Sequence, residues 1–73
     1  MNWQVGFTRQ DGTEPTEDEI RAAVLTRRGL SLVEQVDGAV WLATLDPVDA
    51  ETLQDEGYLS VQVGDLTMIG EMP

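Results

Sequence analysis

The 73-residue chain contains no cysteine, no histidine and no lysine. Without cysteine the fold has neither a disulfide nor a thiolate zinc site. Without histidine it lacks the commonest zinc ligand and the usual general base. A serine or threonine nucleophile would also have no histidine or lysine beside it to activate it. We therefore expect a protein that is not an enzyme and that has no cofactor and no bound metal.

Other motifs that mark a site are missing too. The seven glycines form neither G-x-G-x-x-G nor G-x-x-x-x-G-K, the patterns that cradle phosphates. The acidic stretches DPVDAE and DEG do not match the calcium-binding loop. A regulatory domain that binds a small molecule stays an alternative, although no sequence feature marks its pocket.

Long apolar runs are absent, since none approaches the roughly 20 residues needed to cross a bilayer. The first residues, MNWQVGF, lack the basic and apolar segments of a signal peptide. We expect a soluble cytoplasmic protein that forms a single small α+β domain over residues 1–73. If a phage encodes it, the compartment would be the host cytoplasm.

Negative charge is the most prominent feature that is present. Fourteen acidic residues against four arginines give a net charge of −10. All four arginines lie in residues 1–28, whereas residues 29–73 hold nine acids and no cation. Such a surface repels phosphates, so we expect no direct nucleic-acid binding and no membrane binding. It would attract a basic partner and accelerate the encounter with it.

The same charge could also arise without any partner. Acidic surfaces with little lysine suit proteins that work at high salt, where the charge keeps them soluble. Arginine without lysine is also what the coding bias of a GC-rich genome produces. In either case the acidity would reflect the habitat or the genome and would not mark a binding surface.

The first third of the chain predicts a strand and then a helix. NWQVGFT alternates, with Trp3, Val5 and Phe7 on one face. In PTEDEIRAAVLTRRGL, Thr16 and Glu19 form a capping box, and we expect Gly29 to end the helix. The acids at the start and the arginines at the end complement the helix dipole, so this charge has a local structural role.

The middle of the chain predicts a hairpin, because LSLVEQVDGAVWLATL contains Asp37-Gly38 between two apolar runs. With a two-residue turn, Val36 would face Ala39 and Leu30 would face Leu45, on the buried side of the sheet. DPVDAETLQDEG then predicts a short second helix that ends at Gly57. YLSVQV is a further strand, and LTMIGEMP is a short fifth strand or an ordered tail.

The order strand, helix, strand, strand, helix, strand predicts a ferredoxin-like split βαβ fold. Two helices would cover one face of an antiparallel sheet, and its other face would stay open. That architecture hosts many unrelated functions, so it does not by itself define one.

Two hypotheses for function follow. The first is a non-enzymatic inhibitor that binds a basic, nucleic-acid-handling protein as a nucleic-acid mimic. Phage-encoded inhibitors of CRISPR complexes, polymerases or nucleases have this size and charge. The predicted contacts are the acids Glu14, Glu17, Asp18, Asp46, Asp49, Glu51, Asp55 and Glu56.

The second hypothesis is a structural or assembly module that forms a homodimer through the open sheet face. Its predicted contacts are Val33, Val40, Leu42 and Tyr58. The opposing interpretation is that these residues are ordinary surface, since more than half of a protein's surface is apolar.

Overall fold

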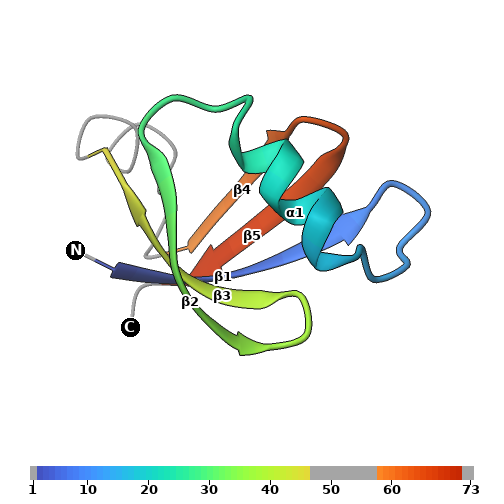
Figure 1. Cartoon of the computed structure of the whole chain (residues 1–73), viewed down its shortest axis with the longest axis horizontal. Helices are drawn as coiled ribbons and strands as arrows, with labels where there is room; N and C mark the ends of the chain where they lie inside the picture. The colour runs from blue at the N-terminus through green and yellow to red at the C-terminus, as the bar shows by residue number, and fades with distance from the viewer. Residues whose placement is uncertain (1, 47–57, 72–73) are drawn as a thin grey trace.

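The computed structural model describes residues 2–46 and 58–71, which form one helix and one five-stranded antiparallel sheet. The strand order is β2-β3-β1-β5-β4, so β1 lies in the middle (Figure 1). The elements are β1 (Asn2–Arg9), α1 (Glu17–Val24), β2 (Leu30–Asp37), β3 (Val40–Leu45), β4 (Tyr58–Val63) and β5 (Leu66–Glu71).

One face of the sheet packs with α1 into the core. The predicted alternation in β1 is confirmed, because Trp3, Val5 and Phe7 are all buried. Burial of these large side chains is the main source of stability in a chain this short. The other buried apolar residues are Ile20, Ala23, Val24, Leu30, Ala39, Trp41, Ala43, Leu45, Leu59, Val63, Leu66 and Met68.

Helix α1 begins as predicted but ends earlier than predicted. The Thr16 hydroxyl accepts a hydrogen bond from the Glu19 amide at 3.2 Å, and the Glu19 carboxylate accepts one from the Thr16 amide at 3.3 Å. This reciprocal pair is the capping box. The helix stops at Val24, and Gly29 has the expected left-handed backbone with φ of 88° only after a further turn. The arginines of the RRG stretch therefore lie in that turn and not in the helix.

The β2–β3 hairpin forms, but its register was predicted wrongly. Leu30 pairs with Leu45 as expected, whereas nearer the turn the pairs are Glu34 with Leu42 and Asp37 with Val40. Two bulges in β2 cause this shift, because each puts two residues of β2 opposite one residue of β3.

The turn itself is displaced by one residue. Its central residues are Gly38 and Ala39, and Gly38 has a left-handed φ of 54°. As a consequence Val36 does not face Ala39 in the core and is half exposed.

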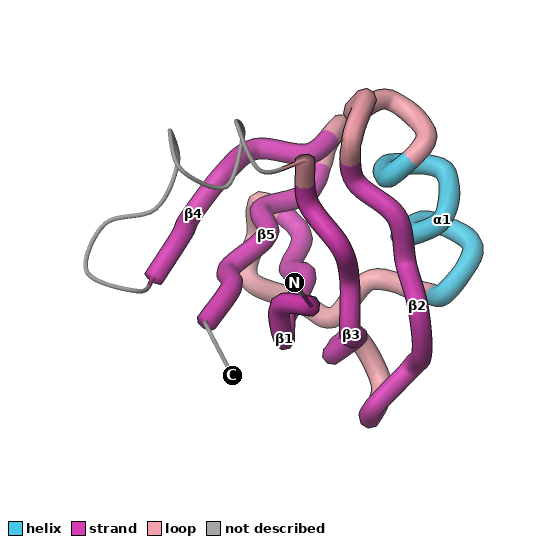
Figure 2. The backbone as a smooth tube through the Cα atoms, turned by 90° about the vertical axis from the view of Figure 1, so that its left-hand side faces the viewer, coloured by secondary structure: helices cyan, strands magenta, loops and turns pink. Residues whose placement is uncertain are grey.

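The α+β class and the antiparallel sheet are confirmed, but the strand order differs from the plain ferredoxin-like one. β3 lies between β1 and β2, as a split βαβ unit requires (Figure 2). On the other side, β5 and not β4 pairs with β1. The fifth strand is a full one because Gly64, with φ of 58°, turns β4 into a tight hairpin with β5. One helix lies within the described residues, and the predicted second helix lies outside them.

Candidate functional site

The face of the sheet that points away from α1 is open along β1. Trp3, Val5 and Phe7 point into the core, so the alternating positions Gln4, Gly6 and Thr8 point outward. Pairing sets Val40 of β3 on one side of Gly6 and Ile69 of β5 on the other. No described helix or loop covers this central part of the face.

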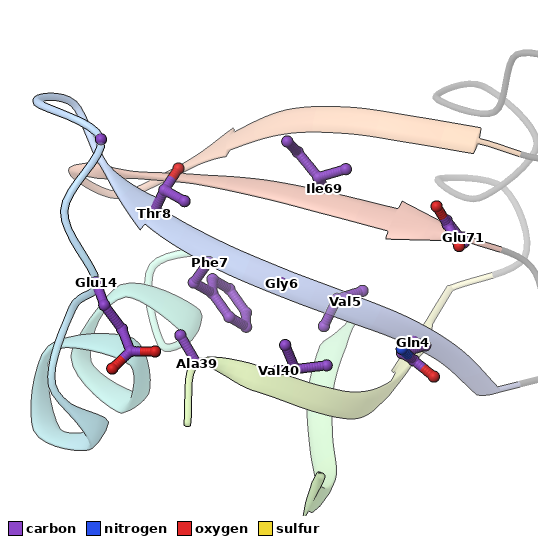
Figure 3. Close-up of a pocket in the computed structure, with 11 residues that line it drawn as sticks. Gln4, Val5, Gly6, Phe7, Thr8, Glu14, Ala39, Val40, Ile69 and Glu71 are labelled. Atoms are coloured by element: carbon purple, nitrogen blue, oxygen red, sulfur yellow. The ribbon is translucent and has the colours of Figure 1, made fainter. Parts of the chain in front are cut away.

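A groove of about 390 Å³ runs along β1 on this open face (Figure 3). Gly6 forms its floor, because a glycine leaves a hollow between the flanking side chains of Val40 and Ile69. Glu71 lines one end of the groove and Glu14 lines the other, and Figure 3 shows the two carboxylates on opposite sides of Gly6. We call this feature the Gly6 groove.

An apolar patch extends from the groove across β3 to β2. The bulges place Val33 beside Glu34 opposite Leu42, and Val36 beside Asp37 opposite Val40. Val33 and Val36 are 53% and 51% exposed, and Ile69 is 38% exposed. We call the following residues the open-face patch: Val33, Val36, Val40, Leu42 and Ile69.

The sequence predicted part of this patch. Val33, Val40 and Leu42 lie together on the same face, whereas only the backbone pairing of Tyr58 with Glu71 is described. Val36 and Ile69 were missed. Alternation in LTMIGE puts Ile69 on the outward side of its strand, but only the pairing of that strand with β1 sets it beside Gly6. No sequence signal fixed the bulge that exposes Val36.

The predicted acidic contacts within the described residues lie in two places. Glu14, Glu17 and Asp18 are exposed at the start of α1, and Asp46 is exposed after β3. Glu17 lies 3.6 Å from the Nε of Arg21 in an exposed i,i+4 ion pair. Asp49, Glu51, Asp55 and Glu56 lie outside the described residues.

Glu14 connects the start of α1 to the β2–β3 turn. Its Oε1 lies so close to Gly38 that a Cβ added there would be 2.8 Å from it. The contact brings the Glu14 carboxylate to the same end of the sheet as Asp37. The sequence pattern groups Glu14 with the acids of the helix and does not reveal its position at the groove.

Two arginines lie between the sheet and α1 or on α1 itself, and two lie in the turn that follows α1. Arg9 is paired with Glu19 of α1, and the guanidinium of Arg21 lies 5.1 Å from the ring centre of Trp41. Arg27 and Arg28 lie in the turn before β2, at the opposite end of that strand from Asp37. No arginine lines the Gly6 groove.

Charge on the open side is therefore uncompensated. Glu14, Glu34, Asp37 and Glu71 have no ion-pair partner among the described residues, and all four are exposed. Carboxylates next to an apolar surface and away from arginines attract cationic groups over several ångströms of water. The Gly6 groove is accordingly suited to a ligand that combines apolar and cationic parts.

Within residues 2–46 and 58–71, no three acidic side chains converge as a metal site would require. A second cavity lies between α1 and the β4–β5 turn and is lined by Glu19, Thr26 and Asp65. The described part of the chain has no helix long and apolar enough to cross a membrane.

Comparison of the chain with protein-family models, with curated proteins and with solved structures found no match.

Proposed function

We propose that this protein is a small acidic, non-enzymatic inhibitor that binds a basic, nucleic-acid-handling partner. The observation that carries the proposal is the separation of charge over the fold. The arginines lie on or near α1, and the carboxylates of the open side have no cation beside them among the described residues. The 73-residue chain has a net charge of −10, because 14 acids outnumber four arginines. Such an excess of negative charge attracts a basic partner.

The kind of partner follows from the sign and the density of this charge. Proteins that handle nucleic acid carry surfaces rich in lysine and arginine that match phosphates. An acidic protein that occupies such a surface excludes the nucleic acid from it, which is how a nucleic-acid mimic inhibits. Phage-encoded inhibitors of CRISPR complexes, polymerases or nucleases are the class that this proposal resembles most.

Self-association through the open-face patch stays a second candidate, favoured by the exposure of Val33, Val36 and Ile69. A two-fold interface would bring the same surface of two copies together. It would therefore oppose Glu34, Asp37 and Glu71 of one copy to the same uncompensated carboxylates of the other. This like-charge contact weakens the dimer relative to a complex with a basic protein.

The first test is a pull-down with the tagged protein from lysate of its source cell, washed at about 0.15 M salt and then at about 1 M, a range over which exposed charges become screened. We expect basic nucleic-acid-handling proteins to be retained at low salt and released at high salt. A bait with Asp18→Asn, Glu34→Gln and Asp37→Asn should retain less of them. The purified partner should then lose its nucleic acid when the acidic protein is added.

Two outcomes would contradict the proposal. Recovery of only the protein itself, indifferent to salt, would favour the homodimer. Loss of folded structure in dilute buffer, measured by circular dichroism, would indicate that the acidity is an adaptation to high salt, because such proteins need counterions to fold.

A further inference from the structure

The Gly6 groove combines three properties. It is hollow above Gly6, its middle is walled by Val40 and Ile69, and each end carries an exposed carboxylate, from Glu14 or Glu71. Apolar atoms in the middle favour an apolar group, and the carboxylates favour a cation at each end. The arrangement thus matches an elongated ligand that has an apolar group in its middle and a cation at each end.

The length of the groove fixes the spacing of such a ligand. Gln4 pairs with Glu71 at one end of the groove, and Thr8 lines the other end together with Glu14. Four residue steps along a strand cover about 13 Å. An extended peptide advances at the same rate, and its residues i, i+2 and i+4 point to the same side. Three successive side chains of one peptide face would therefore reach both ends and the middle.

We propose that the Gly6 groove binds an extended segment of the partner with the pattern basic-x-apolar-x-basic. The apolar side chain occupies the hollow above Gly6, and the two basic side chains meet Glu71 and Glu14. This inference rests on the proposed function and specifies which surface of the protein recognises the basic partner. The remaining acids would then steer the encounter without making the specific contact.

A second copy of this chain is a poorer occupant than a basic segment. The four arginines are Arg9, Arg21, Arg27 and Arg28, and no two of them are four residues apart. The chain therefore contains no segment of the proposed pattern. Its own open face would also bring Glu71 and Glu14 against like charges.

Gly6→Val is the variant that tests the hollow. Gly6 lies in a strand, and its φ is outside the left-handed region that only glycine adopts readily. A Cβ there would lie 4.0 Å from Cγ2 of Val40, which is an ordinary contact. The substitution fills the hollow with a residue that strands favour, so it should leave the fold intact.

The experiment is an NMR titration of the ¹⁵N-labelled protein with the capped peptide Arg-Thr-Leu-Thr-Arg at low salt. We expect shifts centred on the amides of Gly6, Val40 and Ile69. Gly6→Val should raise the Kd at least about tenfold, and replacing the Leu of the peptide by Ser should have a similar effect. The double variant Glu14→Gln, Glu71→Gln should raise the Kd about fivefold, as two exposed ion pairs would.

A matched double variant, Asp18→Asn with Asp65→Asn, changes the net charge equally away from the groove. We expect it to bind the peptide nearly as well as the wild type. If both double variants weaken binding equally and Gly6→Val does not, the groove assignment is wrong while attraction of a basic partner stands. If the peptide causes no shifts at all, the groove assignment also fails, and the pull-down decides the proposed function separately.

Discussion

Arg9 on β1 donates two hydrogen bonds to the Glu19 carboxylate on α1, from Nε at 3.0 Å and from Nη2 at 2.5 Å. The same carboxylate accepts the Thr16 amide in the capping box. One glutamate thus fixes the start of α1 and ties the helix to the central strand. Bidentate pairing of this kind is the strongest geometry available to arginine and a carboxylate.

This arrangement predicts how stability changes with acid. The hydrogen bond from Arg9, followed by that from the Thr16 amide, lowers the pKa of Glu19 from 4.5 to about 2. A carboxyl whose pKa is lower in the folded state stabilises the fold above its unfolded pKa. Its contribution is therefore complete above about pH 4.5 and is lost as the pH falls through about 2. Thermal melts across this range should show the decline.

Glu19→Gln is the matched control, because glutamine still completes a capping box but cannot form the ion pair. The melting temperature of the wild type should exceed that of the variant at neutral pH, and the difference should vanish below about pH 2. Comparing the two proteins removes the effect of Asp11, whose pKa the Thr13 hydroxyl and amide also lower. A difference that is independent of pH would show that the ion pair does not stabilise the fold.

The two faces of the sheet predict opposite effects for glycine-to-alanine changes. At Gly70 a Cβ would lie 3.0 Å from Cγ of Leu59 and 3.2 Å from Cγ1 of Val5, inside the core. Gly70→Ala should destabilise the protein by about 1–3 kcal/mol through overpacking. Gly6→Ala meets no such crowding and should stabilise by up to about 1 kcal/mol, because alanine restricts the unfolded chain.

Urea unfolding of these two variants measures both values. The comparison is controlled within the sheet, since Gly6 lies on β1 and Gly70 on the adjacent β5. A loss of stability at Gly6 as large as that at Gly70 would mean that the open face is packed against something.

Changes of valine to threonine, which has nearly the same shape, test the bulges. Val36→Thr should change the free energy of unfolding by less than about 0.5 kcal/mol, because the side chain is half exposed. Val63→Thr puts a hydroxyl into a core position that is 1% exposed and should cost about 1–3 kcal/mol. An equal cost at both positions would support the uninterrupted register, in which Val36 faces Ala39.

Local patterns in the sequence by themselves determined much of this fold. The capping box at Thr16, the inward residues of β1 and the left-handed Gly29 involve contacts within one turn or one strand, and all three are confirmed. The α+β class follows from the same local signals. The separation of the arginines from most of the acids is likewise visible in the sequence, because it is a matter of position along the chain.

Only the tertiary structure decided how these pieces pair. Both β4 and β5 alternate, so no local pattern says which of them lies beside β1, and the long-range pairing of β5 with β1 decides it. The two bulges in β2 lie on either side of the pair of Gln35 with Trp41, and no pattern within β2 predicts them. The Gly6 groove exists because Val40, Ile69, Glu14 and Glu71 are brought together from parts of the chain far apart in sequence, and long-range pairing alone sets them around one glycine.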